Sequence, residues 1–261
     1  MHLTTYGSAD GAPIYVLVHG FPGGADDWRP VAELLSADGA RVLVPDLLGF
    51  GASPRPTSFE ELWAPAQADA LAAELDAAGV RSATVVGHDY GGPVAITLAD
   101  RRPDLVGALA IADTNAFPDT PIDLPLSLVL VPGVGWVAER LLFSAFSLKA
   151  LGGRFSKVPG TRIHVNDGDE ATSIRILFAG VLRDLAALYT PIEQAGGRVD
   201  VSTLVVWGDQ DPLFSVEQGR RTAELLHARF EVLDGVGHLV PAEAPERLAA
   251  LLTGWRAESV D

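Results

Sequence analysis

The sequence predicts an α/β protein in which a mostly parallel sheet is covered by helices on both faces. Apolar, β-rich runs alternate with helical segments along much of the chain. The runs are apolar at consecutive positions, which is typical of strands buried on both faces rather than strands with one side in water. The chain has 261 residues, of which 48% are hydrophobic, so it is long and apolar enough to build one large core.

The first 115 residues contain the most regular part of this alternation. Strands are expected at 2–6, 14–18, 41–44, 83–86 and 105–112, and helices at 60–78 and 91–99. Gly79 ends the first of these helices, and Arg102-Pro103 ends the second because proline has no backbone N–H for a helical bond. We assign residues 1–115 to the first part of the core.

The alternation stops between residues 116 and 197 and then resumes. The interrupted stretch has proline-rich turns, apolar segments at 124–131 and 141–148, and a helical pattern through 174–188. Beyond it, strands are expected at 203–208 and 229–233, and helices near 216–226 and from residue 245. The sequence therefore predicts a helical insertion at 116–197, with the second part of the core at 198–261.

The charge balance argues against several classes of partner. The chain carries 19 basic and 34 acidic side chains, a formal charge of -15, which repels nucleic acids and anionic membrane surfaces. Its longest uncharged apolar stretch, 124–138, is interrupted by proline and glycine and is shorter than the roughly 20 residues of a membrane helix. There is no cysteine, and residues 1–10 lack a signal-peptide pattern. We expect a cytoplasmic protein that binds neither nucleic acid nor membrane. The sequence is compatible with a homodimer.

Asp89 is expected at a very sharp turn between the strand at 83–86 and the helix at 91–99. Gly87 and Gly91, two residues before and after it, permit the tight backbone and the close approach of the helix. This is the nucleophile-elbow pattern, with aspartate in place of serine. The alternative is an ordinary surface turn that carries an acidic helix cap.

A second motif, His19-Gly20-Phe21-Pro22, directly follows the strand at 14–18. Taken alone, it equally fits an ordinary Gly/Pro-rich loop after a strand. Together, this loop and the Gly-His-Asp-aromatic-Gly turn at 87–91 resemble the α/β-hydrolase superfamily, in particular its epoxide hydrolase and haloalkane dehalogenase branches. The resemblance implies the α/β-hydrolase fold, with about seven to eight strands and a helical cap inserted over the active site.

The resemblance also implies a triad. Asp89, Asp211 and His238 stand in the superfamily order of nucleophile, acid and base, each after a strand, where open α/β sheets place their sites. Asp113, at the end of the strand at 105–112, is the alternative acid, because some relatives carry the acid there. The backbone N–H groups of Phe21 and Tyr90 are expected to form the oxyanion hole.

An aspartate nucleophile restricts the chemistry. A carboxylate is a weak nucleophile toward a peptide or ordinary ester carbonyl, but it can displace a leaving group at saturated carbon and form an alkyl ester. His238, oriented by Asp211, would then activate the water that cleaves this ester. The scheme needs no metal and no organic cofactor.

The leaving group decides the substrate class. An opening epoxide oxygen needs a proton donor, whereas a departing halide needs N–H donors around it. Epoxide hydrolases usually supply two tyrosines from the cap, and here Tyr189 is the one tyrosine in the predicted cap. His164 and Trp136 are further candidate donors, although Tyr189 also fits a packing role and Trp136 fits the cap core better.

We therefore expect an epoxide hydrolase that acts on a lipophilic small molecule. A haloalkane dehalogenase with the same triad is the nearest alternative, although Phe21 and Tyr90 replace the Asn and Trp that those enzymes tend to carry. A non-hydrolytic lyase-type enzyme or a ligand-binding homologue is the alternative of another class.

Overall fold

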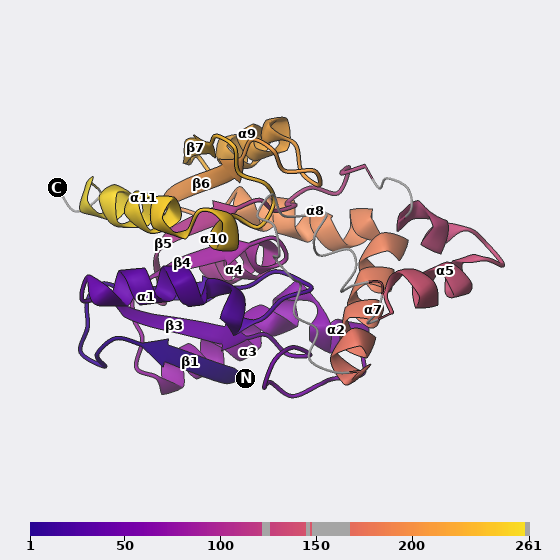
Figure 1. Ribbon diagram of the computed structural model, residues 1–261, viewed down its shortest axis with the longest axis horizontal. Helices are drawn as coiled ribbons and strands as arrows, with labels where there is room; N and C mark the ends of the chain where they lie inside the picture. The colour runs from indigo at the N-terminus through magenta and orange to yellow at the C-terminus, as the bar shows by residue number, and fades with distance from the viewer. Residues whose placement is uncertain (122–125, 145–146, 148–167, 259–261) are drawn as a thin grey trace.

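The computed structural model describes residues 1–121, 126–144, 147 and 168–258, which form a seven-stranded sheet covered by helices (Figure 1). The strands are β1 (His2–Tyr6), β2 (Ile14–Val18), β3 (Arg41–Asp46), β4 (Ala83–His88), β5 (Val106–Ala112), β6 (Ser202–Gly208) and β7 (Arg229–Leu233). They lie in the order β1-β3-β2-β4-β5-β6-β7, and all neighbours are parallel except β1 and β3. The predicted fold class is confirmed.

The helices form a hydrophobic core on each face of the sheet. One core contains side chains of α1 (Arg29–Ala37) and α11 (Pro245–Glu258). The other contains side chains of α3 (Ala64–Ala77), α4 (Gly91–Arg101), α8 (Leu185–Gly196) and α9 (Val216–Leu225). The remaining described helices are η1 (Ala25–Trp28), α2 (Phe59–Leu62), η2 (Leu126–Leu130), α5 (Gly135–Leu142), α7 (Gly168–Arg183) and α10 (Val240–Glu243).

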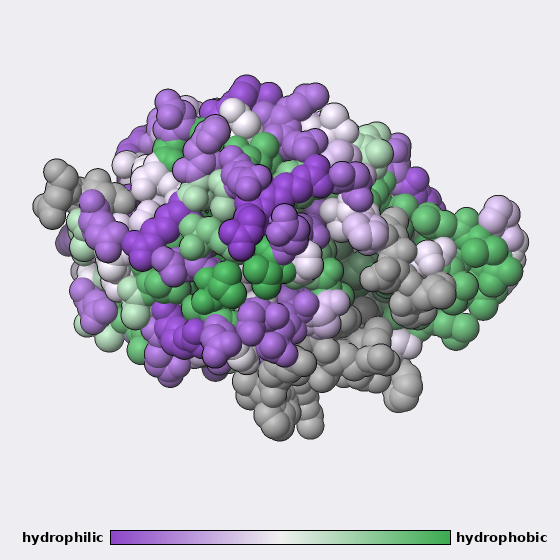
Figure 2. Space-filling model, turned by 90° about the horizontal axis from the view of Figure 1, so that it is seen from above, coloured by the Kyte–Doolittle hydropathy of each residue, from purple (hydrophilic) through white to green (hydrophobic). Residues whose placement is uncertain are grey.

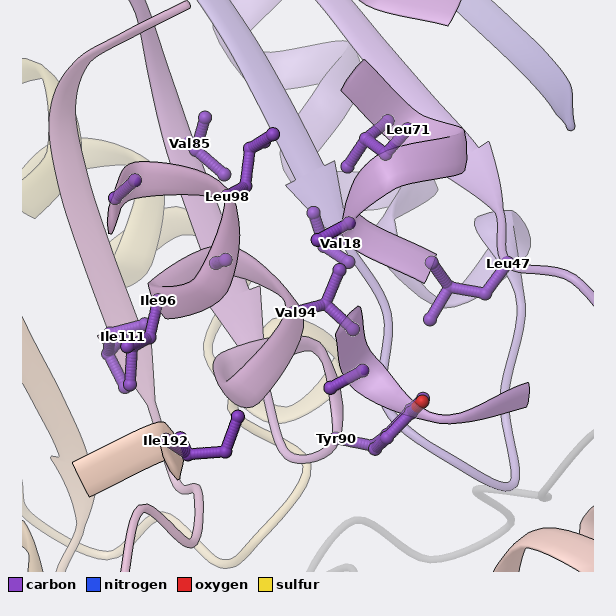
Figure 3. Close-up of a cluster of buried hydrophobic side chains, with 14 of the residues drawn as sticks. Val18, Leu47, Leu71, Val85, Tyr90, Val94, Ile96, Leu98, Ile111 and Ile192 are labelled. Atoms are coloured by element: carbon purple, nitrogen blue, oxygen red, sulfur yellow. The ribbon is translucent and has the colours of Figure 1, made fainter. Parts of the chain in front are cut away.

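Helix α4 is the most deeply buried helix near the Asp89 turn. Every residue from Gly91 to Ala99 is buried. Val94 and Leu98 lie among side chains of the central strands, such as Val18 and Val85 (Figure 3). Each fully buried side chain of this size contributes about 1.5–3 kcal/mol of transfer free energy, so the packing of α4 fixes the turn before it.

The helices expected at 60–78 and 174–188 are each interrupted. Pro65, which has no backbone N–H, takes the first turn of α3, and the preceding Trp63 is extended (φ -79°, ψ 155°), so α2 and α3 are separate helices. In the second case Asp184 leaves the helical conformation and its side chain accepts a hydrogen bond from the Ala187 N–H. It thereby begins α8 as an N-cap residue.

The surface around η2 and α5 is strongly apolar. Figure 2 shows hydrophobic residues gathered at the end of the molecule where α5 lies in Figure 1. The exposed large side chains of this segment, which we call the α5 apolar surface, are Leu128, Leu130, Val131, Val134, Trp136, Val137 and Leu141. None of the helices within the described ranges is long and apolar enough to cross a membrane.

Candidate active site

Asp89 lies at a strained turn between β4 and α4. Its φ is +50°, in the left-handed region that aspartate tolerates better than most residues. A Cβ atom on Gly91 would lie 2.2 Å from the Val18 carbonyl oxygen, so a side chain there would push the helix away. The Asp89 N–H donates to the Ala112 carbonyl at 3.1 Å, and its side chain is 15% exposed. The carboxylate therefore projects from a rigid turn at the carboxyl edge of the sheet.

The loop after β2 contacts this carboxylate through its backbone. The Phe21 N–H donates to Asp89 Oδ2 at 2.9 Å. A Cβ atom on Gly20 would lie 2.6 Å from Asp89, so the approach requires glycine. His19, which is fully buried, holds the loop: its Nδ1–H donates to the Gly20 carbonyl at 2.6 Å, and its Nε2 accepts from the Leu47 N–H at 3.0 Å.

Tyr90 occupies the N-cap position of α4. Its backbone N–H therefore lies at the end of the helix where N–H groups have no partner within the helix, which suits the expected oxyanion role. Its phenol donates to the Leu62 carbonyl and is already committed there.

His238 and Asp211 form a hydrogen-bonded pair beside Asp89. His238 Nδ1 lies 2.9 Å from Asp211 Oδ2, and His238 Nε2 lies 3.7 Å from Asp89 Oδ1. Asp211 Oδ1 accepts from the Leu213 and Phe214 N–H groups at 2.7 and 3.1 Å. Asp211 is therefore fixed by backbone and presents its second oxygen to the imidazole.

The charges of this pair reinforce one another. Burial alone would lower the pKa of His238, but the charge and hydrogen bond of Asp211, with smaller contributions from Asp89 and Glu243, raise it above 6.5. Burial alone would raise the pKa of Asp211, but His238 and the two backbone N–H donors hold it below its ordinary value. Asp211 is consequently ionised at neutral pH.

His88 has a structural role, and its partner lies far away in the sequence. Its Nε2–H donates to the backbone carbonyl of His238 at 2.8 Å, across 150 residues of chain. Burial, together with repulsion from His238, lowers the pKa of His88 to about 4. The neutral imidazole therefore anchors the loop that carries His238.

Asp113, the alternative acid, lies at the end of β5 with none of its surface exposed. Its Oδ1 accepts from the Gly208 N–H at 2.9 Å. The structure thus brings Asp211, and not Asp113, into hydrogen-bonding contact with His238.

Tyr189 of α8 is buried near Asp89. Burial, followed by the charge of Asp89, raises its pKa above the ordinary value, while a hydrogen bond from the Asn115 side chain opposes this shift. Asn115 Oδ1 already accepts from Phe117 N–H and from the side chains of Thr120 and Gln218, so its NH2 group is the partner of Tyr189. The Tyr189 hydroxyl proton is then available to another acceptor.

Aromatic rings from the core and the insertion pack next to this site. The Phe21 ring lies 5.0 Å from Tyr90 and 4.6 Å from Phe178 of α7, and Phe178 stacks on Phe143 at 4.6 Å. The Tyr189 ring lies 5.3 Å from Trp63. Aromatic rings so close to the carboxylate favour an apolar ligand.

Of the other candidate donors, Trp136 lies on the surface and His164 lies outside the described residues. Trp136 is 64% exposed on α5, where its ring contacts the Arg140 guanidinium at 5.9 Å, so its expected place in the cap core is wrong. The residues of the α5 apolar surface face solvent although their hydrophobicity is that of core residues. His164, and parts of the segments 124–131 and 141–148, lie outside the described residues. No group of three or more potential metal ligands occurs in the part of the chain that the structure describes.

A family model described as the alpha/beta hydrolase family matches residues 15–251. The chain is 27% identical to a 2-hydroxymuconate semialdehyde hydrolase of Pseudomonas putida, over 94% of this chain and 87% of the relative. It is 26% identical to epoxide hydrolase A of Mycobacterium tuberculosis, over 93% of this chain and 89% of that protein. A solved 2-hydroxy-6-oxo-6-phenylhexa-2,4-dienoate hydrolase of Rhodococcus sp. strain RHA1 matches with a TM-score of 0.81 at 22% identity, over 98% of this chain and 94% of that one, which shows a shared fold.

Proposed function

The chain belongs to the alpha/beta hydrolase family, and on that premise we propose that it opens a lipophilic epoxide to a diol. One observation carries the proposal. The Asp89 carboxylate stands at the elbow with Oδ2 held by the Phe21 N–H and Oδ1 facing His238. Attack at saturated carbon, followed by hydrolysis of the resulting ester, uses every group of this arrangement.

In the first step, Asp89 Oδ1 attacks a ring carbon of the epoxide, and the carbon–oxygen bond of the ring breaks. The developing alkoxide takes the proton of the Tyr189 hydroxyl. The Asn115 amide donates to the phenolic oxygen and so stabilises the negative charge that forms on Tyr189. The product of this step is an Asp89 alkyl ester with a neighbouring hydroxyl group.

In the second step, His238 takes a proton from water, and the hydroxide attacks the carboxyl carbon of Asp89. The oxyanion forms at Oδ2, where the Phe21 N–H donates and where the Tyr90 N–H is the second proposed donor. Asp211 stabilises the imidazolium by its charge and its hydrogen bond. Collapse of the tetrahedral intermediate breaks the ester C–O bond, and the departing diol oxygen takes the proton of the His238 imidazolium. The proton left on the Asp89 carboxyl group passes to the Tyr189 phenolate, which restores the starting state.

The same geometry is less suited to the alternatives. An aspartate is a poor nucleophile at a carbonyl carbon, which argues against direct hydrolysis of an ester substrate, the reaction of an esterase. A dehalogenase would use Asp89 in the same way but would have no use for the Tyr189 proton. A lyase-type enzyme or a binding protein would form no ester on Asp89.

A parallel screen of epoxides and haloalkanes tests the proposal, scoring diol by chromatography and halide by ion analysis. We expect diol from an aromatic or long-chain epoxide and no halide release. Asp89→Asn is the matched control, because asparagine keeps the shape and accepts the positive φ while it removes the charged nucleophile. Halide release without diol, or diol formation that survives Asp89→Asn, would overturn the proposal.

A further inference from the structure

Asp113 is a buried acid for which the proposed reaction has no use. It lies at the end of β5 with φ +40° and no exposed surface. Its Oδ1 accepts from the Gly208 N–H, but Oδ2 is buried and accepts no hydrogen bond. A charged carboxylate would leave that oxygen without a donor, which is costly in a site that excludes water.

The carboxyl group of Asp113 faces Asp211, and the two share a side-chain hydrogen bond. Two carboxylates in contact in a buried site cannot both be ionised, so one of them carries the proton. Asp211 has two backbone N–H donors and the His238 imidazole, whereas Asp113 has one N–H donor. The negative charge is therefore better stabilised on Asp211.

We propose that Asp113 is a positioning residue that stays protonated at neutral pH and donates its Oδ2 proton to Asp211, which in turn holds His238. The proton assignment is independent of the substrate, while its importance for ester hydrolysis rests on the proposed function. The pattern extends the triad by one member, so that Asp211 is held by two backbone N–H groups, one imidazole and one carboxylic acid.

The electrostatic surroundings agree with this assignment. Burial, followed by the charge of Asp211, raises the pKa of Asp113 well above its ordinary range, and the Gly208 N–H only partly opposes this. The titratable groups that surround the Asp113–Asp211–His238 chain are His88 at the end of β4, Asp89 directly after it, and Glu243 on α10. The charge of Glu243 adds to that of Asp211 in disfavouring a negative charge at Asp113.

The hydrogen bond from Asp113 has a consequence for His238. A donor on Asp211 disperses the negative charge that attracts the imidazolium, so the bond limits how far Asp211 raises the pKa of His238. Loss of the donor should raise that pKa, whereas an amide in place of the acid should keep the donor. If Asp113 were ionised, either change would instead remove a negative charge and lower the pKa of His238.

Infrared difference spectroscopy on the full-length protein tests the proton directly. At pH 7 the wild type should show the carbonyl band of a protonated carboxylic acid, sensitive to deuterium, that disappears in Asp113→Asn. Asp209→Asn is the matched control, since Asp209 is a half-buried carboxylate two residues from Asp211 that accepts from the Gly235 N–H, and its replacement should leave the band in place. Identical acid bands in the wild type and Asp113→Asn would overturn the proposal.

A second measurement covers the case in which Asp113→Asn fails to fold. With carboxyl-carbon-labelled aspartate in the wild-type chain, nuclear magnetic resonance should find one aspartate still in the acid form at pH 7. No such signal would contradict the assignment.

Titration of the His238 ring separates positioning from mere burial. Asp113→Gly, which accepts the positive φ and removes the donor, should raise the pKa of His238 by up to about one pH unit. Asp113→Asn should bring it back toward the wild-type value. A lowered pKa in both variants, or no change in Asp113→Gly, would refute the positioning role. Because no substrate is used, a failure of the epoxide proposal leaves these results interpretable.

Discussion

The carboxyl edge of the sheet and the α5 apolar surface lie in one chain but differ in how their side chains are held. At the sheet edge, Asp211 accepts hydrogen bonds from two backbone N–H groups and faces His238, and Asp89 is fixed by a backbone donor. On α5, Trp136 and Leu141 are each 64% exposed. The proposed chemistry therefore depends on carboxylates that are held by hydrogen bonds from backbone N–H groups. From residues 116–197, only side chains that lie near Asp89, such as Tyr189, contribute to it.

The largest effect is expected at Asp211. Asp211→Asn would place an NH2 group against His238 Nδ1 and favour the wrong imidazole tautomer, so hydrolysis of the Asp89 ester should slow by about 10⁴-fold, roughly 5 kcal/mol. Formation of the ester does not need the base and should slow far less. Rapid-mixing kinetics that resolve the two steps provide the measurement. Equal slowing of both steps would contradict a role of Asp211 in ester hydrolysis alone.

Replacement of Tyr189 tests whether a side chain of α8 takes part in the reaction at the carboxyl edge of the sheet. Its hydroxyl would bond more strongly to the developing alkoxide than to the neutral epoxide, so Tyr189→Phe should slow ester formation by about 10²- to 10⁴-fold. Tyr90→Phe is the matched control, because the Tyr90 hydroxyl donates to the Leu62 carbonyl instead. Unchanged epoxide turnover in Tyr189→Phe would reduce Tyr189 to a packing residue.

The pH dependence of hydrolysis sharpens the account of His238. Only the neutral imidazole accepts a proton from water, and its pKa is raised above 6.5, so the rate should rise with pH through a midpoint above 6.5. In Asp211→Asn the main attraction that raises this pKa is lost, so the midpoint should move to lower pH. A midpoint that moves upward would show that Asp211 is not the charged partner of His238. Single-turnover rates across pH provide the test.

The smallest effect is expected on the α5 apolar surface. Trp136 contacts Arg140 at an exposed position, so Trp136→Ser should change the free energy of unfolding by less than about 1 kcal/mol and leave ester formation unaltered. Chemical denaturation and epoxide turnover measure the two quantities. A loss of ester formation comparable to that of Tyr189→Phe would show that the α5 apolar surface also contributes to the reaction.

The sequence was most informative where structure depends on neighbouring residues. The strands expected at 14–18 and 229–233 coincide with β2 and β7, because continuous apolar β-rich runs bounded by turn residues have few other solutions. The turn at Asp89 was readable for the same reason, since its geometry demands glycine at fixed spacing. The helix expected at 60–78 is interrupted, because Pro65 lies in the first turn of α3 and Trp63 before it is extended.

Contacts between distant segments were not readable in this way. The bond from His88 to the His238 carbonyl joins residues 150 positions apart, and the hydrogen bond of Asn115 with Tyr189 crosses from the core to α8. Hydrophobicity alone does not distinguish an apolar segment in the core from one on the surface, so it does not predict the exposed position of Trp136.

Trapping the ester on Asp89 tests the central claim most directly. In His238→Gln the base is absent, so incubation with a substrate that the wild type converts should leave the peptide containing Asp89 heavier by the mass of that substrate. In the wild type, a single turnover in water labelled with heavy oxygen should place the label in the Asp89 carboxyl group, because water attacks its carbonyl carbon. A substrate that turns over yet leaves neither the adduct nor the label on Asp89 would contradict the covalent mechanism.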